Sequence, residues 1–104
     1  MINLENFSKL SDGTYSIKGK KINRDKGYQV SFHEIGRRYS SKEYSLLVGY
    51  IQSITGASPE VGIFKGGVPH ISFCVGSEKV AQMICQMFGQ LAYWDWRTRK
   101  SIFM

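Results

Sequence analysis

The stretch that decides the fold is residues 59–96, which read PEVGIFKGGVPHISFCVGSEKVAQMICQMFGQLAYWDW. Gly66 and Gly67 separate two apolar runs and predict a β-hairpin, because paired glycines supply the positive φ values of a two-residue turn. Side chains alternate between the two faces of a strand. With that turn, the expected core face carries Phe64, Ile71, Phe73 and Val75. The opposite face carries Val61, Ile63, His70, Ser72 and Cys74.

A helix with two marked ends follows the hairpin. Ser77 is suited to cap its N-terminus, and Gly89 is suited to the left-handed position just beyond its C-terminus. The apolar stripe expected to face the core consists of Val80, Met83, Ile84, Met87 and Phe88. After this helix, the aromatic-rich residues 91–96 predict a strand and residues 101–103 predict a short return strand.

A longer helix is predicted over residues 41–55. Ser40 and Glu43 have the spacing of a capping box, in which the serine hydroxyl caps the helix and the glutamate reaches back to the serine amide. Gly56 is placed to end the helix. Its expected buried stripe consists of Tyr44, Leu47, Val48, Ile51 and Ile54.

Two further segments, residues 14–18 and 28–33, alternate polar and apolar side chains as half-buried strands do. From residue 28 onward the order is strand, helix, strand, strand, helix, strand, which is the order of a ferredoxin-like fold. We therefore expect a single α+β domain over residues 1–104. Its antiparallel sheet would carry two amphipathic helices on one face and an extra N-terminal strand.

The chain is basic, with 14 lysines and arginines against 8 acidic residues and a net charge of +6. That balance favours nucleic acid, acidic protein surfaces or anionic lipid as partners, although it also serves simple solubility. The two cysteines have no paired spacing, and no apolar run approaches the roughly 20 residues that span a bilayer. The N-terminus also lacks a signal-peptide pattern. We expect a cytoplasmic protein with reduced thiols and no membrane partner.

Few residues are suited to chemistry. His70 and Cys74 share one face of an expected strand, but four residues at about 3.3 Å each separate them by roughly 13 Å, beyond hydrogen-bond reach. The cysteines and histidines are too scattered for a compact zinc site, and the sequence contains no Walker or Rossmann pattern. We expect no catalytic residue, metal or cofactor. A Cys–His grouping assembled by the fold, for example with His33 and Asp95, is the enzyme alternative.

The candidate binding surface combines the basic loop 18–26 with the aromatic and basic segment 93–100. Cations in both segments are suited to phosphates, and an exposed aromatic ring is suited to stacking on bases or anchoring a protein partner. Trp94 and Trp96 fall on one strand face and Tyr93 on the other, so one helix layer cannot cover all three. The expected binding residues are Lys20, Lys21, Arg24, Tyr93, Trp94, Trp96, Arg97, Arg99 and Lys100.

Three short runs resemble segments of small orphan proteins of bacteriophages and mobile elements: residues 27–31, residues 61–64 with the following glycine pair, and residues 90–95. Such proteins often act as stoichiometric inhibitors of host defence machinery, including CRISPR systems. They often mimic DNA with acidic surfaces, whereas this chain is basic, so the resemblance implies inhibition through other contacts. The implied role is an anti-CRISPR-like inhibitor of a host protein or nucleoprotein complex. The alternative is a free-standing single-stranded nucleic-acid-binding module.

Overall fold

The computed structural model describes residues 4–31, 40–63 and 68–104. In chain order, its elements are η1 (Leu4–Phe7), β1 (Gly13–Ser16), β2 (Lys21–Ile22), β3 (Tyr28–Ser31), α1 (Ser41–Thr55), β4 (Glu60–Ile63), β5 (His70–Val75), α2 (Glu78–Phe88), β6 (Ala92–Asp95) and β7 (Lys100–Phe103).

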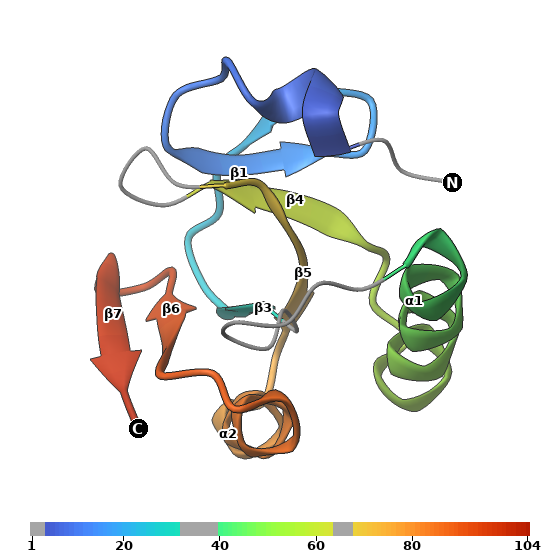
Figure 1. The fold of residues 1–104 in the computed structure, drawn as a ribbon. Coiled ribbons are helices and arrows are strands. Elements are labelled where there is room, and N and C mark those ends of the chain that lie inside the picture. Colours follow the sequence, from blue (N-terminus) through green and yellow to red (C-terminus); the bar gives the residue numbers. More distant parts are fainter. Residues whose placement is uncertain (1–3, 32–39, 64–67) are drawn as a thin grey trace.

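The strands form one antiparallel sheet of seven in the described chain, in the order β2-β1-β4-β5-β3-β6-β7 (Figure 1). Helices α1 and α2 pack on the same face of this sheet, so the α+β class is confirmed. The ferredoxin-like arrangement in particular stays a prediction. The expected N-terminal strand is present as β1. A further short strand, β2, lies inside the segment that was expected to be a loop, where it pairs with β1 and closes one edge of the sheet.

Helix α1 begins and ends where the sequence predicts. The Ser40 hydroxyl accepts a hydrogen bond from the Glu43 amide at 3.2 Å, and the Glu43 carboxylate accepts one from the Ser40 amide at 3.0 Å. Gly56 follows in the left-handed conformation with φ of 70°. Ile51 is fully buried, but the expectation that Ile54 is buried is wrong, since this residue is 46% exposed. Ile54 lies on the outer side of the helix, in line with the exposed Leu46 and Tyr50 at a spacing of four residues.

Helix α2 also has the predicted caps, Ser77 and Gly89. Its buried face is rotated relative to the prediction and consists of Ala81, Ile84, Cys85 and Phe88. Met83 and Met87 were expected in the core but are 48% and 46% exposed. The small side chains of Ala81 and Cys85 let the helix approach the sheet closely, and the unbranched methionines extend along its outer side.

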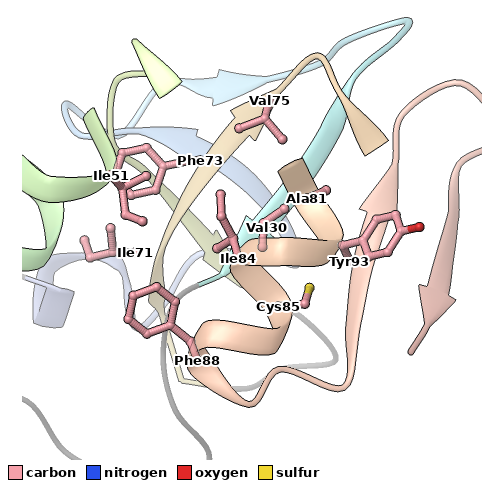
Figure 2. Packing of buried hydrophobic residues seen from close by; sticks show 10 residues of the cluster. All are labelled: Val30, Ile51, Ile71, Phe73, Val75, Ala81, Ile84, Cys85, Phe88 and Tyr93. Carbon is pink, nitrogen blue, oxygen red and sulfur yellow. The ribbon is translucent and has the colours of Figure 1, made fainter. Parts of the chain in front are cut away.

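The main core lies between the two helices and the sheet (Figure 2). Val30 on β3, Phe73 on β5 and Ile84 on α2 have no exposed surface. A second, smaller cluster lies beneath η1 and consists of Phe7, Tyr15, Val61 and Ile63. Both clusters lie on the same face of the sheet, because Val61 is paired directly with Ile71.

This pairing corrects the predicted hairpin register. Gly62 lies opposite His70, whereas a two-residue turn at Gly66 and Gly67 would place Ile63 there. The difference of one residue moves Val61 and Ile63 to the core face with Ile71, because a one-residue slip exchanges the two faces of a strand. It also turns Glu60 and Gly62 to the opposite face. The predicted core position of Phe64 and the turn itself lie outside the described residues.

Within the described part of the chain, neither α1 nor α2 is long and apolar enough to cross a membrane.

Candidate ligand-binding hollow

A hollow of about 930 Å³ opens on the face of the sheet opposite the helices. Its lining includes Ile22 on the edge strand β2 and Phe103 on the other edge strand, β7. Residues from both ends of a seven-stranded sheet can line one hollow only if the sheet is strongly curved, so this face is concave. We call the space the concave hollow and define it by Thr14, Ile22, Gly62, His70, Trp94 and Phe103.

Small side chains create the floor of the concave hollow. Gly62 lies between Thr14 on β1 and His70 on β5, so the middle of this row across the sheet has no side chain. The neighbouring row pairs Ser31 with Ser72. A Cβ added at Gly62 would meet only the Ser72 side chain, with the hydroxyl oxygen at 3.5 Å, which is ordinary contact. The floor is therefore open because Gly62 has no side chain, and its backbone is not strained.

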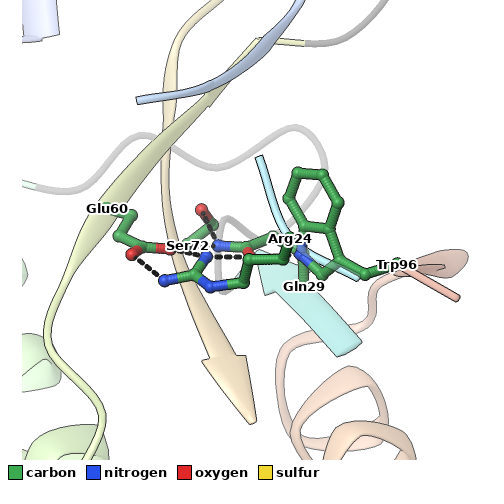
Figure 3. A network of polar contacts seen from close by, with 5 residues as sticks. All are labelled: Arg24, Gln29, Glu60, Ser72 and Trp96. Carbon is green, nitrogen blue, oxygen red and sulfur yellow. Dashed lines mark hydrogen bonds and ion pairs between the residues drawn. The ribbon is translucent and has the colours of Figure 1, made fainter. Parts of the chain in front are cut away.

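A polar network lies under one side of the hollow (Figure 3). The Arg24 guanidinium donates two hydrogen bonds to the Glu60 carboxylate, one of them at 2.7 Å, and a third to the Gln29 side-chain oxygen at 3.2 Å. The Gln29 amide nitrogen donates to Glu60 at 2.9 Å and to the Ser72 hydroxyl at 3.0 Å. Three strands and the β2–β3 loop are thereby joined on the concave face.

Arg24 was expected to bind a polyanion from a solvated loop; the solvated position is wrong, and the binding role stays a prediction. Its side chain is 30% exposed, and that of its partner Glu60 is 10% exposed. The hydrogen bonds to Glu60 raise the pKa of Arg24 further above its usual range. Both terminal nitrogens of the guanidinium donate to the Glu60 carboxylate. The Arg24 charge therefore stabilises Glu60 within the sheet.

The same network fixes the two tryptophans. The Trp96 indole nitrogen donates to the Gln29 side-chain oxygen at 3.0 Å, and the Trp96 ring is buried. Trp94 contacts Trp96 edge to face, with ring centroids 6.2 Å apart and an angle of 85° between the planes. Trp94 is only partly buried and lines the hollow. Of the three aromatic residues predicted as anchors in segment 93–96, Trp94 therefore offers the accessible ring.

Tyr93 is a predicted binding residue that the structure buries. It is only 3% exposed, and its hydroxyl donates to Glu78 on α2 at 2.8 Å. Burial, followed by the hydrogen bond to Glu78, raises its pKa. The alternation along β6 turns Tyr93 to the helix layer and Trp94 to the hollow, as the sequence predicts for opposite faces.

The structure brings together the two segments that were predicted to form one surface. Arg99 donates to the Asn23 side chain at 2.9 Å and to the Arg24 carbonyl at 3.1 Å, which joins the β6–β7 turn to the β2–β3 loop. The Arg99 guanidinium also lies 5.9 Å from the centroid of the Trp96 ring. Arg99 lines the hollow. Lys21 lies directly opposite Tyr15, so its side chain is on the core face of β2 and not in the hollow. The exposed cations that flank Lys21 and Arg99 in the chain are Lys20, Arg97 and Lys100.

Sequence reasoning missed several polar and small residues of the concave face: Gln29, Ser31, Glu60, Gly62 and Ser72. Their signal is the alternation along β3, β4 and β5, in which these residues fall between the apolar side chains of the core face. Phe103 was also missed as a candidate; it is 74% exposed and lines the hollow.

Cys74 lies next to this face and is half-buried. Burial raises the pKa of its thiol, and the nearby Arg24 charge opposes that shift only in part. Within residues 4–31, 40–63 and 68–104, His, Cys, Asp and Glu form no group of three that could hold a metal ion. His33, named in the enzyme alternative, lies outside the described residues.

Comparison with protein-family models found no match to this chain, and searches of curated proteins and of solved structures found no similar protein. The chemistry of the concave hollow is therefore the basis for assigning a ligand.

Proposed function

We propose that this protein is a non-enzymatic binding module for single-stranded nucleic acid, with the ligand lying in the concave hollow. One observation carries the proposal: the accessible Trp94 ring and the exposed Phe103 ring line the same hollow as the cation Arg99. Proteins that bind single strands without strong sequence preference combine a positive groove for the backbone with aromatic rings on which bases stack.

The charge around the hollow supports this ligand class. Arg99 is an exposed cation that lines the hollow close to the Trp96 ring. Glu60, the carboxylate beside the floor, is neutralised by Arg24. Beyond the rim, the exposed Lys20 and Lys100 extend the positive surface along both edges, in keeping with the net charge of +6.

The thiol chemistry supports a binding role over an enzymatic one. Cys74 is the cysteine nearest the hollow, and burial favours its protonated form, whereas a nucleophilic cysteine requires a thiolate. His70 lies four residues away on the same strand, roughly 13 Å at about 3.3 Å per residue, and is too distant to activate the thiol directly.

The test is binding of a labelled oligodeoxythymidylate, measured by fluorescence anisotropy at two salt concentrations. Trp94→Ala should weaken binding roughly tenfold, because stacking on an aromatic side chain contributes about 1–3 kcal/mol per base. Arg99→Glu should weaken binding and reduce the dependence of affinity on salt by about one unit for each phosphate that is no longer neutralised. Circular dichroism spectra confirm that each variant is folded.

Lys79→Glu is the matched control, because Lys79 is an exposed cation on α2, on the opposite side of the sheet. It makes the same change in net charge and should leave binding close to that of the wild type. Equal losses of affinity in Arg99→Glu and Lys79→Glu would show that attraction is due to net charge alone. That result, or the absence of measurable binding at low salt, would refute the proposal.

A second candidate is the accessory inhibitor implied by the resemblance to phage proteins, with a host nucleic-acid-handling protein as its target. The observation that favours it is an apolar row on the outer side of α1, four residues apart: Leu46 is 66% exposed, Tyr50 49% and Ile54 46%. Exposed apolar side chains in a row are typical of protein contacts. An inhibitor that docks through this row would lose activity in Leu46→Glu and keep it in Trp94→Ala, with little dependence on salt.

A further inference from the structure

We infer that strand β7 is a docking edge for a second copy of this chain, so that two copies join their sheets into one. β7 is the last strand of the described sheet and forms its outer edge beside β6 (Figure 1). An edge strand presents backbone N–H and C=O groups that its own sheet leaves unpaired, and a strand from another chain can pair with them. The inference does not depend on the ligand of the concave hollow.

The hydrogen bonds between β6 and β7 determine which backbone groups of β7 face outward. The Met104 amide donates to the Leu91 carbonyl at 2.9 Å. In an antiparallel pair, hydrogen-bonded and non-hydrogen-bonded positions alternate along each strand. Ile102, two residues before Met104, therefore also bonds to β6, whereas the N–H and C=O groups of Ser101 and Phe103 point away from the sheet.

The two described edges of the sheet differ in how well they are protected from pairing. Natural edge strands are shielded by short length, by proline or by charged side chains. β2, at the other edge, has only two residues and follows the exposed Lys20. β7 has four residues, contains no proline and carries its only charge, Lys100, at its first position. Of the two described edges, β7 is therefore the one suited to pair with another strand.

β7 is complementary to a second copy of itself in the antiparallel direction. When Ser101 lies opposite Phe103 of the other copy, the two residues exchange backbone hydrogen bonds, and a two-fold axis passes beside Ile102. Every outward-facing backbone group of Ser101 and Phe103 finds a partner in this register. One strand thus supplies both the donors and the acceptors that the edge requires.

The side chains of β7 also favour this register. Ser101 and Phe103 lie on the concave face, and Ile102 lies on the helix face with Tyr93. The Phe103 ring, 74% exposed in one copy, would be covered beside the small Ser101 of the other copy. The two Ile102 side chains would meet at the axis on the helix face. Because Ser101 and Phe103 line the concave hollow, the hollows of the two copies would adjoin at this edge.

Charge repulsion favours the antiparallel direction, since each copy has a net charge of +6. Arg97, Arg99 and Lys100 all lie at one end of the edge, where β6 turns into β7, and a parallel pairing would place these turns side by side. In the antiparallel register, the two Lys100 residues are offset by four positions, roughly 14 Å at about 3.4 Å per residue. That distance exceeds the Debye length of about 8 Å at physiological salt, so repulsion between the turns is largely screened.

The first experiment measures the mass of the protein by sedimentation velocity over a wide range of concentrations, without nucleic acid. Ser101→Pro removes the outward N–H of β7 and keeps the hydrogen bonds to β6, and proline is tolerated at such edge positions. Lys21→Pro on β2 is the matched control. The Ser16 amide donates to the Lys20 carbonyl at 2.8 Å, so by the same alternation the Lys21 N–H points outward from the opposite edge. Circular dichroism establishes that each variant is folded.

A second experiment uses two cysteine variants to test the register. Ile102→Cys places two thiols beside the axis, where the Cα atoms of a non-hydrogen-bonded pair are about 4.5 Å apart, within the range that a disulfide spans. Lys100→Cys places the two thiols roughly 14 Å apart on the same edge. Under mild oxidation, Ile102→Cys should form a covalent dimer much faster than Lys100→Cys. The wild type measures the background from Cys74, which is half-buried, and Cys85, which is buried.

The wild type and Lys21→Pro should form a dimer whose fraction rises with concentration. Ser101→Pro should weaken this dimer at least roughly tenfold, because each copy loses one hydrogen bond to the other. A wild type that stays monomeric at every concentration would overturn the inference, even if it binds an extended peptide at β7.

Equal dimerisation of Ser101→Pro and Lys21→Pro would also overturn it, as would equal rates of disulfide formation in Ile102→Cys and Lys100→Cys. If Ser101→Pro does not fold, the two cysteine variants decide. Because no nucleic acid is present, failure of this inference leaves the proposed function standing.

Discussion

Replacing Arg24 by methionine tests whether this cation is part of the folded sheet or of a solvated binding loop. Methionine keeps an unbranched apolar stem and removes the guanidinium. Glu60, 10% exposed, then loses both hydrogen bonds from the cation and keeps the one from Gln29. Leaving a buried charge without its partner costs about 3–5 kcal/mol. Because the Arg24 side chain is itself 30% exposed, we expect a smaller loss, about 2–3 kcal/mol.

The assay is equilibrium unfolding in urea together with a thermal scan, both followed by tryptophan fluorescence. For a domain of this size, a loss of about 2 kcal/mol lowers the Tm by about 8 °C or more. Adding Glu60→Gln to Arg24→Met should restore part of the stability, since the double variant no longer carries an unpaired buried carboxylate. Circular dichroism establishes that the variants fold at the starting temperature.

Lys20→Met is the matched control, because Lys20 is exposed and belongs to the same predicted basic loop. It removes one positive charge, as Arg24→Met does, and should change the free energy of unfolding by no more than about 0.5 kcal/mol. If the two variants unfold at the same urea concentration, or if Glu60→Gln gives no recovery, the network does not hold the loop to the sheet and the reasoning is refuted.

Three further predictions test the elements around the hollow. Gly27→Ala should cost more than about 1 kcal/mol in urea unfolding, because Gly27 has φ of 100° and an added Cβ would lie 2.9 Å from the Cys74 sulfur; unchanged stability would contradict the turn geometry. Ser40→Ala should cost about 1 kcal/mol by removing the capping box, and an unchanged denaturation midpoint would mean that α1 does not depend on this cap. Burial raises the pKa of Cys85 from 9.0 to about 11, so the unfolded chain loses this proton first as pH rises. The wild type should therefore lose stability between pH 9 and pH 11 relative to Cys85→Ala, and parallel pH profiles would contradict that shift.

The sequence by itself determined the parts of the fold that local chemistry controls. Ser40 and Glu43 specify the start of α1, because both halves of the capping box lie within one turn of the chain. Ser77 and Gly89 specify the bounds of α2 in the same way. The alternation along β6 is enough to separate Trp94 from Tyr93, since neighbouring side chains of a strand must point to opposite faces.

The tertiary structure decided what depends on register and on which elements meet. A shift of one residue in the pairing of β4 with β5 exchanged the faces of β4 and turned Glu60 toward the concave face, where Arg24 reaches it from a point 36 residues earlier in the chain. The local sequence around Arg24 is a run of basic residues and contains no sign of that partner. The hollow also depends on strand pairing. The missing side chain at Gly62 leaves a space on the concave face only because β1 and β5 place Thr14 and His70 on either side of it. Capping and alternation act over a few residues and can be predicted from sequence, whereas a pairing between distant strands is chosen by the burial of a whole sheet face.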